Sequence, residues 1–528
     1  MSIKHADYVV VGTGSSGAVV AARLSERSAD TVVALEAGPE DKNQYAHIPA
    51  AFSKLFQTEL DWNYLTTPQP ELADRQIFYP RGKLLGGSSS MNAMMWVRGY
   101  AADYDEWAQE AGDEWSFKNV AKYFARIESV EGASASDEGR GGPLHVSRQR
   151  SVSRWTLDFL DAVENAGYKR ERANTPQPEG FTQTMVNQNR GARFSTADAY
   201  LKPIRKRTNL NVITGAHATR VLFDGSRAIG VEYLKDGATH VVKAGKEVIL
   251  SGGAINTPQL LMLSGIGDEA QLREHGIPIQ HHLPGVGRNL LDHLVSLIGF
   301  AVDSGTLFDA EKPLQLINYL TRRRGMLTSN VGEAYGFVRS NPDLELPDIE
   351  IIFGAAPFYD EGIGVPAGHG IGLGPILLKP RSQGTVTLRS SDPTAKPVVD
   401  PKYLSDSDGA DRTAMLEGLR VAHRIATTQP LGGKIKKFLQ PKREQDTLEA
   451  TLEDALNWYS HTLYHPTTTC RMGTDADSVV TPDLKVRGVE GLRVADASVM
   501  PTIIRGHTHA PCVVIGEKAA DLVRAVSV

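Results

Sequence analysis

Apolar residues follow two different patterns along the chain. Near its start, strands predicted at residues 7–11 and 31–35 are apolar after their first residue and flank a mainly apolar helical segment at 18–24, which is typical of parallel strands buried on both faces. In the second half, strands such as 349–353 appear and a helix is predicted over 411–427. We therefore predict an α/β fold (α+β overall), in which a Rossmann-like unit is joined to a sheet-plus-helix part.

A glycine-rich turn follows the first strand and opens the helix. Gly12 permits the tight turn, Gly14 lets the backbone approach a pyrophosphate, and Gly17 allows the helix to pack closely on the strand. Glu36 ends the second strand about 20 residues later, where an acid that binds ribose is expected. Because this acid would repel a 2′-phosphate, the unit predicts a site for a dinucleotide that lacks one.

Length and composition limit the class of protein. The 528 residues are too many for one ordinary core, which predicts two domains. The chain is 41% hydrophobic and 23% charged, its formal net charge is −5, and no basic tract is interleaved with aromatic residues. We therefore expect no nucleic-acid partner. The densest basic run, residues 322–324, is interpreted as the solvated end of a helix.

Membrane, metal and disulfide signals are weak. No apolar stretch approaches the ~20 residues of a transmembrane segment, and the first strand begins too early to leave room for a signal peptide. Cys470 and Cys512 are the only cysteines, which excludes a disulfide framework, and no metal-ligand spacing is present. We expect a cytoplasmic protein without a metal.

Two further segments are unusually rich in small residues. Residues 81–93 are RGKLLGGSSSMNA and residues 253–267 are GAINTPQLLMLSGIG; such stretches let the backbone lie against a flat ligand. Together with residues 285–293 and 491–498, they resemble in order and spacing the signature motifs of the glucose–methanol–choline (GMC) oxidoreductases. The resemblance covers essentially the whole chain, and it is closest to the bacterial choline-dehydrogenase-like branch.

The resemblance implies FAD as the cofactor and a discontinuous domain division. Residues 1–155, 190–305 and 460–528 would form a Rossmann-like FAD-binding domain. Residues 156–189 and 306–459 would form a sheet-plus-helix substrate-binding cap domain.

The cofactor contacts of the family can be carried over position by position. They fall on Gly12, Gly14, Ser16, Gly17, Glu36, Gly82, Gly87, Ser88, Asn92, Ala93, Val221, Asp496 and His509. Some choline-oxidising relatives attach the flavin covalently through a histidine, and Met91 stands at the matching position here. Because a thioether is a poor candidate for that bond, we expect non-covalent FAD.

Two loops near the end of the chain carry histidines. An alcohol proton leaves only when a base lies within hydrogen-bond reach, and imidazole titrates near neutrality. The resemblance implies oxidation of an alcohol by hydride transfer to flavin N5, with His465 as the base and His507 as its partner. His509 competes with His507 for the partner role. A helix predicted over 513–524 would direct its N-terminus at the flavin.

The substrate is less well defined by the sequence. Glu333 resembles the glutamate that meets the quaternary ammonium group of choline, but that recognition also needs aromatic faces. Val331 and Gly332 stand where choline oxidisers carry tryptophan, so a primary alcohol is favoured and choline is not. The residues that we predict to contact substrate are Glu333, Phe353, Phe358 and Leu463.

Other reactions and partners are left open at this point. A hydroxynitrile lyase would use the same fold and histidines for non-redox chemistry, with a structural FAD. Light-driven decarboxylation of fatty acids is disfavoured because that branch lacks the histidine kept here. The sequence also leaves open whether O2 or a quinone-like carrier reoxidises the flavin, and how many copies of the chain assemble.

Overall fold

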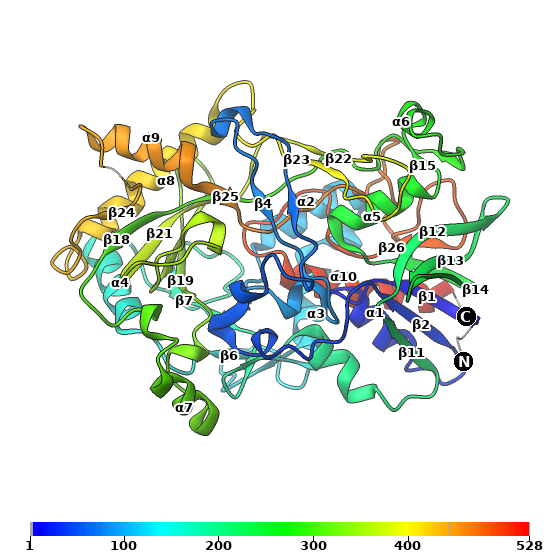
Figure 1. The fold of residues 1–528 in the computed structure, drawn as a ribbon, viewed down its shortest axis with the longest axis horizontal. Helices are drawn as coiled ribbons and strands as arrows, with labels where there is room; N and C mark the ends of the chain where they lie inside the picture. Colours follow the sequence, from blue (N-terminus) through cyan, green and yellow to red (C-terminus); the bar gives the residue numbers. More distant parts are fainter. Residues whose placement is uncertain (1–3, 443, 527–528) are drawn as a thin grey trace.

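The computed structural model describes residues 4–442 and 444–526. Within these residues, two large β-sheets lie side by side along the long axis of the molecule (Figure 1). We call them the mixed sheet, which contains β1, and the antiparallel sheet. Their combination of a Rossmann-like unit with a sheet-plus-helix part confirms the predicted fold class.

The mixed sheet has a parallel core and an antiparallel extension. Its strand order is β11-β2-β1-β14-β13-β12, and β26 pairs with β14. The pairs among β11, β2, β1, β14 and β26 are parallel, whereas β12 and β13 pair antiparallel. The strands are β1 His5–Val11, β2 Val32–Glu36, β11 Leu210–Thr214, β12 His217–Asp224, β13 Arg227–Lys235, β14 Ala238–Leu250 and β26 Leu492–Val494.

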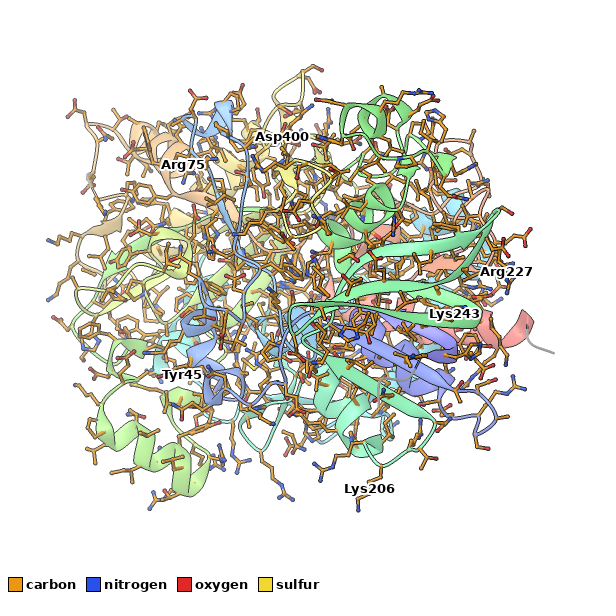
Figure 2. All side chains as sticks on the ribbon, turned by 45° about the vertical axis from the view of Figure 1, so that its right-hand side comes forward. Tyr45, Arg75, Lys206, Arg227, Lys243 and Asp400 are labelled. Atoms are coloured by element: carbon orange, nitrogen blue, oxygen red, sulfur yellow. The ribbon has the colours of Figure 1, made fainter. Side chains whose placement is uncertain are left out.

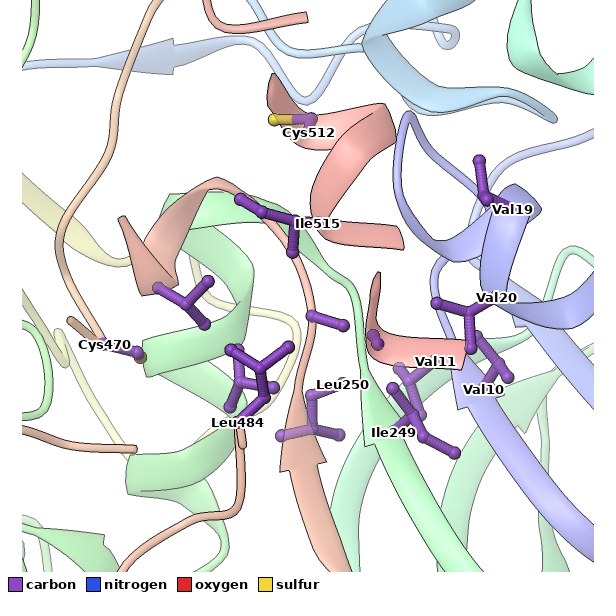
Figure 3. Close-up of a cluster of buried hydrophobic side chains, with 14 of the residues drawn as sticks. Val10, Val11, Val19, Val20, Ile249, Leu250, Cys470, Leu484, Cys512 and Ile515 are labelled. Carbon is purple, nitrogen blue, oxygen red and sulfur yellow. The ribbon is translucent and has the colours of Figure 1, made fainter. Parts of the chain in front are cut away.

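The parallel core is packed with β-branched side chains. Val10 of β1 is fully enclosed, and Figure 3 shows it beside Val20 of α1 (Gly17–Leu24) and near Ile249 of β14. The last helix, α10 (His509–Val526), packs against α1. A Cβ on Gly516 would lie 2.7 Å from the carbonyl oxygen of Ser16. The closeness of the two helices therefore depends on a glycine in α10.

The antiparallel extension has one solvated face. Along β14, Val242 is buried while Lys243 is exposed, and Figure 2 shows Arg227 at the right-hand edge of the molecule and Lys243 on the strands beside it. This alternation is typical of an antiparallel sheet with water on one side.

The antiparallel sheet has the strand order β24-β18-β21-β20-β19-β7, with β17 pairing with both β21 and β25. Strands β17, β18 and β25 come from residues that the predicted division assigns to the FAD-binding domain. The strands are β7 Phe181–Gln183, β17 Leu294–Ser296, β18 Ile298–Ala301, β19 Gly332–Val338, β20 Ile349–Gly354, β21 Gly370–Leu377, β24 Phe438–Gln440 and β25 Ser460–Thr462.

Three helices cover this sheet: α4 (Arg154–Asn165), α8 (Ala410–Thr427) and α9 (Leu448–Tyr459). The helix predicted over 411–427 is α8. It lies directly on β21, since a Cβ on Gly418 would be 2.5 Å from the Cβ of Pro375.

The other helices and short strands lie outside the two sheets. The run Arg322–Arg324 ends α7 and is exposed, as predicted. Among the described residues, no helix is both long and apolar enough to cross a membrane. The helices are α2 Ala101–Ala111, α3 Phe117–Ile127, α5 Gly253–Leu263, α6 Glu269–Glu274 and α7 Pro313–Arg322. The strands are β3 Tyr64–Leu65, β4 Phe78–Tyr79, β5 Glu128–Val130, β6 Leu144–Arg148, β8 Met185–Val186, β9 Gln188–Asn189, β10 Ala192–Arg193, β15 Ile266–Gly267, β16 His281–His282, β22 Thr385–Thr387 and β23 Val398–Asp400.

Both cysteines are buried and unpaired. Figure 3 shows Cys512 on α10 and Cys470 in the loop that follows β25. Burial raises the pKa of Cys512 to about 12 and that of Cys470 well above its usual value.

Candidate active site

A cavity of about 320 Å³ takes its walls from both sheets and from distant parts of the chain. Most of the predicted site residues line it, but Gly17, Val221, Glu333 and Phe353 do not. The predicted residues that line the cavity are Gly12, Gly14, Ser16, Glu36, Gly82, Gly87, Ser88, Asn92, Ala93, Phe358, Leu463, His465, Asp496, His507 and His509.

One end of the cavity is shaped by glycines. Gly12 has a φ of +93°, and a Cβ there would lie 2.4 Å from the carbonyl oxygen of Ser251. A Cβ on Gly87 would lie 2.8 Å from the Cα of Gly14, so the second glycine-rich segment closes onto the first turn. Gly17 lies behind this turn, where a Cβ would be 2.0 Å from the carbonyl oxygen of Gly12. Its role is therefore close packing, in keeping with its predicted position in the turn.

Glu36 at the end of β2 lies beside this turn. Its carboxylate accepts hydrogen bonds from the backbone N–H of Thr13 at 3.0 Å, the Thr13 hydroxyl at 2.7 Å and the N–H of Gly38 at 3.0 Å. Burial raises the pKa of Glu36, while these donors lower it. The carboxylate is thereby fixed at the cavity wall, where it has further lone pairs for ribose hydroxyls.

Asp496 ties its own loop to the start of α5 at the cavity. One carboxylate oxygen accepts from the N–H of Gly253 at 2.8 Å and the hydroxyl of Thr257 at 2.6 Å. The other accepts from the N–H and the hydroxyl of Ser498. Burial raises the pKa of Asp496, and these hydrogen bonds oppose that shift.

His509 belongs to the glycine end. Its Nδ1 is 2.9 Å from the Ser15 hydroxyl in the first turn, and its ring meets the edge of Trp96. Burial, aided by the charge of Arg193, lowers the pKa of His509 to about 4. A neutral imidazole at the start of α10 therefore faces the glycine turn, separate from the other two histidines.

The residues at this end fit a flavin dinucleotide. The exposed backbone of the glycine turn lies at the N-terminus of α1, where a pyrophosphate is favoured, and a Cβ at Gly12 or Gly87 would collide with the backbone opposite. Glu36 is in place for the ribose. The cavity then continues past Ser88, Asn92 and Ala93 to the histidines.

The other end of the cavity holds His465 and His507. Their ring centroids are 4.9 Å apart and the rings are nearly perpendicular. His507 is buried and His465 is half-buried, and the backbone N–H of His465 donates to Asp292 at 2.8 Å. Burial, followed by the rings of His507 and His293, lowers the pKa of His465 well below its usual value. The base candidate is therefore neutral at neutral pH.

His293 determines which nitrogen of His465 carries the proton. Nε2 of His293 is 3.1 Å from the carbonyl oxygen of Leu378, which can only accept, so this nitrogen carries the hydrogen. Burial lowers the pKa of His293 to about 3, which leaves Nδ1 of the neutral ring as an acceptor. Nδ1 of His465 lies 2.9 Å away and must donate to it. Nε2 of His465 consequently keeps a free lone pair.

His507 is held by a buried carboxylate. Its Nε2 is 3.0 Å from Oε1 of Glu350 on β20, and the Glu350 side chain is fully enclosed. The second oxygen, Oε2, has no hydrogen-bond partner among the described residues. Because a carboxylate can only accept, Nε2 of His507 carries a hydrogen, and the ring is fixed against His465.

Two predicted substrate residues lie outside the cavity, which corrects their assignment. Glu333 is buried, and its carboxylate accepts from the N–H of Ser153 and the hydroxyls of Thr156 and Ser329. Phe353 stacks on Phe159 of α4 with ring centroids 4.5 Å apart. Residues on a strand alternate between faces; Phe353 therefore points into the core, away from the cavity.

Val221, which was predicted to contact the cofactor, does not line the cavity. Its backbone N–H donates to the Ser264 hydroxyl at 2.9 Å, and its side chain is buried. Residues 216–218, a few positions earlier, line the cavity instead.

His293 and Glu350 were not predicted as site residues, although both positions carry a signal. Glu350 interrupts the apolar strand 349–353 with a charge, and its neighbour Ile352 on the same face lines the cavity. His293 ends the motif at 285–293. A charge within a buried strand requires a partner, and here that partner is His507.

Known proteins resemble this chain over its whole length. GMC oxidoreductase family models match residues 6–295 and 380–516. An uncharacterized GMC-type oxidoreductase of Mycobacterium tuberculosis is 63% identical over 524 residues, which cover 98% of this chain and 99% of that protein. An alcohol dehydrogenase (acceptor) of Pseudomonas putida is 39% identical over 528 residues, covering 98% and 95%.

Solved structures agree with these relatives. Formate oxidase of Aspergillus oryzae, solved to examine the effect of a mutation on FAD modification, superimposes with a TM-score of 0.92 at 27% identity and covers 99% of this chain and 98% of that one. The chain therefore belongs to the GMC oxidoreductase family, whose cofactor is FAD.

Proposed function

We propose that this protein oxidises a primary alcohol to the aldehyde, with His465 as the base and FAD held non-covalently. The observation that carries the proposal is the hydrogen-bond chain from Leu378 through His293 to His465, which leaves Nε2 of His465 free to accept a proton. FAD, when bound, supplies the acceptor for the hydride from the alcohol carbon.

The chain's own residues prepare the proton transfer. Burial keeps His465 neutral, so its lone pair is available at neutral pH. When Nε2 accepts the hydroxyl proton, the ring becomes positively charged, and Nδ1 continues to donate to His293. The Asp292 carboxylate, which accepts a hydrogen bond from the backbone N–H of His465 at 2.8 Å, lies near that charge. His507, held by Glu350, supports the base from the other side.

The cavity wall supports an uncharged, mainly apolar alcohol. Phe358 and Leu463 line it together with Val295, Leu297 and Ile352. Glu333, the carboxylate that would recognise choline, lies outside the cavity, where three donors from the protein satisfy it. The name of the Pseudomonas putida relative, alcohol dehydrogenase (acceptor), is consistent with this substrate class.

The test is anaerobic reduction of the flavin by a panel of alcohols, followed by admission of air. Bleaching of the flavin absorbance by primary alcohols, but not by choline, is the expected result. Rapid return of the absorbance in air would identify O2 as the acceptor, and slow return would favour a quinone-like carrier. Cleavage of a cyanohydrin with no bleaching by any alcohol would overturn the proposal in favour of lyase chemistry.

A further inference from the structure

Helix α7 turns its apolar side chains toward solvent. The exposed fractions are 77% for Leu314, 44% for Leu316, 56% for Ile317 and 61% for Leu320. At 100° per residue, the last three of these side chains fall on one face of the helix. Four large apolar side chains on ten residues form a contiguous exposed patch, which is unusual for a surface helix.

The face of α7 that packs on the protein is polar. The buried Tyr319 hydroxyl donates to the carbonyl oxygen of His47 at 3.3 Å, and the side-chain oxygen of Gln315 accepts from the N–H of Met326 at 3.3 Å. A surface helix ordinarily buries its apolar stripe and exposes its polar face. The amphipathic character of α7 is therefore reversed, and the protein fold leaves its apolar face without a partner among the described residues.

Basic residues surround this apolar face. Lys312 precedes the helix, and the run Arg322–Arg324 ends it. The nearby acids are already neutralised, since Asp309 pairs with Lys312 and Glu311 with Lys54. None of the three arginines forms an ion pair within the described part of the chain. A chain of net charge −5 thus concentrates unpaired positive charge beside its exposed leucines.

The size and position of α7 suit a flat surface. Ten residues extend about 15 Å, far short of a bilayer's hydrocarbon core, so the helix can lie on a membrane but cannot cross it. Figure 1 shows α7 protruding at the lower left corner of the molecule, with the antiparallel sheet above it. Tyr319 anchors it to the segment at residues 44–56, whose Phe52 and Phe56 line the cavity.

We propose that α7 docks the protein on an anionic lipid surface. Its apolar residues would enter the boundary between headgroups and acyl chains, and the arginines would meet lipid phosphates. A second copy of the chain fits less well. Pairing two α7 helices in parallel brings the two Arg322–Arg324 runs together, where their like charges repel. A stable dimer buries about 800 Å² on each partner. The patch comes from one short helix and is small for such an interface.

The test is co-sedimentation of the FAD-loaded full chain with lipid vesicles. Strong binding is expected to phosphatidylcholine vesicles that contain phosphatidylglycerol, weak binding to phosphatidylcholine alone, and release by salt. The double variant Ile317→Glu/Leu320→Glu should lower the affinity more than tenfold. Neutralising Arg322 and Arg324 to Gln should lower it about fivefold for each charge.

A matched control uses the exposed apolar residues of α9, which lies at the opposite corner of the same half (Figure 1). Leu448 is 40% exposed and Trp458 is 53% exposed. The variant Leu448→Glu/Trp458→Glu adds the same charge and should leave vesicle binding unchanged. All variants should keep wild-type flavin absorbance and alcohol turnover, which establishes that they fold.

Three results would overturn the proposal. The first is no sedimentation of the wild type with anionic vesicles. The second is equal loss of binding in the α9 control. The third is a dimer, detected by analytical ultracentrifugation, that dissociates in Ile317→Glu/Leu320→Glu and does not bind vesicles, which would assign the face to a second copy.

Discussion

The two ends of the cavity are built in different ways. The glycine end is shaped by backbone that approaches backbone, as at Gly12 and Gly87. The histidine end is shaped by side chains that come from four separate segments. His293 and His465 form one hydrogen-bonded pair, Glu350 and His507 form another, and the rings of His465 and His507 are in contact. At the first end an added methyl group has no room. At the second end, the nitrogen of His465 that carries the hydrogen determines whether the lone pair of Nε2 is free.

This difference separates binding from chemistry. A change at the glycine end should remove the cofactor without altering the base, and a change at the histidine end should remove the reaction while the cofactor stays. Variants at each end can therefore break one property at a time.

The largest effect is expected for His465→Ala. Without the base, the rate of anaerobic flavin reduction by an alcohol should fall about 10²–10⁴-fold, while FAD remains bound. Stopped-flow absorbance measures both quantities. His217→Ala is the matched control, since His217 also lines the cavity but lies among the residues near the glycine end. Full activity in His465→Ala would refute the assignment of the base.

At the opposite end, Gly12→Ala should weaken FAD binding about 100-fold or more. The new Cβ would meet the carbonyl oxygen of Ser251, and φ is +93°. Gly112→Ala is the control for backbone strain. Gly112 has a similar φ of +92°, but an added Cβ there would have nothing within 4 Å, so this variant has the strain without the collision. Titration of the apoprotein with FAD measures the affinity, and similar losses in both variants would exclude the collision as the cause.

His293→Phe should slow flavin reduction about tenfold to a hundredfold with little change in FAD affinity. The variant removes the acceptor for Nδ1 of His465, so the proton can move to Nε2, where it blocks the base. Nitrogen-15 NMR of histidine-labelled protein reads the tautomer directly. A purely structural role for His293 would leave His465 protonated on Nδ1 in the variant.

The smallest effect concerns stability near the histidine end. Burial raises the pKa of Glu361 to about 7, above its usual value of 4.5. The folded state therefore binds a proton that the unfolded state has released, and this contribution to stability is lost as the pH rises through 7. The free energy of unfolding should fall by about 1 kcal/mol between pH 6 and pH 8 from this group.

Glu361→Gln should remove that part of the pH dependence. Urea unfolding at several pH values measures it. Asp392→Asn is a suitable control, because Asp392 is an exposed acid whose pKa is lowered by local hydrogen bonds, and it should not change the slope in this range. An unchanged slope in Glu361→Gln would contradict the prediction.

The glycine end could be predicted from the sequence because its requirements are local. A tight turn and a close approach each demand glycine at a fixed place, and Gly12 and Gly87 therefore carry the information alone. The family and the fold class follow from those motifs and are confirmed. The roles of the individual site residues stay predictions, even where the residues line the cavity.

The histidine end could be predicted only in part. His465 and His507 were recognisable in their motifs, but their partners depend on which face of a distant strand meets them. On β20, Glu350 points toward His507 and Phe353 points into the core. The sequence shows that successive side chains of this strand point to opposite faces, but it does not identify the face that lines the cavity. Glu333 illustrates the same limit, because its carboxylate turns to Ser153, Thr156 and Ser329.

The two unpaired thiols give the molecule a built-in reporter. Cys470 is fully enclosed, whereas Cys512 is 8% exposed and lines the cavity. A small alkylating reagent should therefore modify Cys512 only when FAD has left, and slowly, because the thiolate is scarce at neutral pH. Modification of Cys470 requires the chain to unfold. The number of labels per chain, read by mass spectrometry, thus distinguishes an emptied protein from a denatured one.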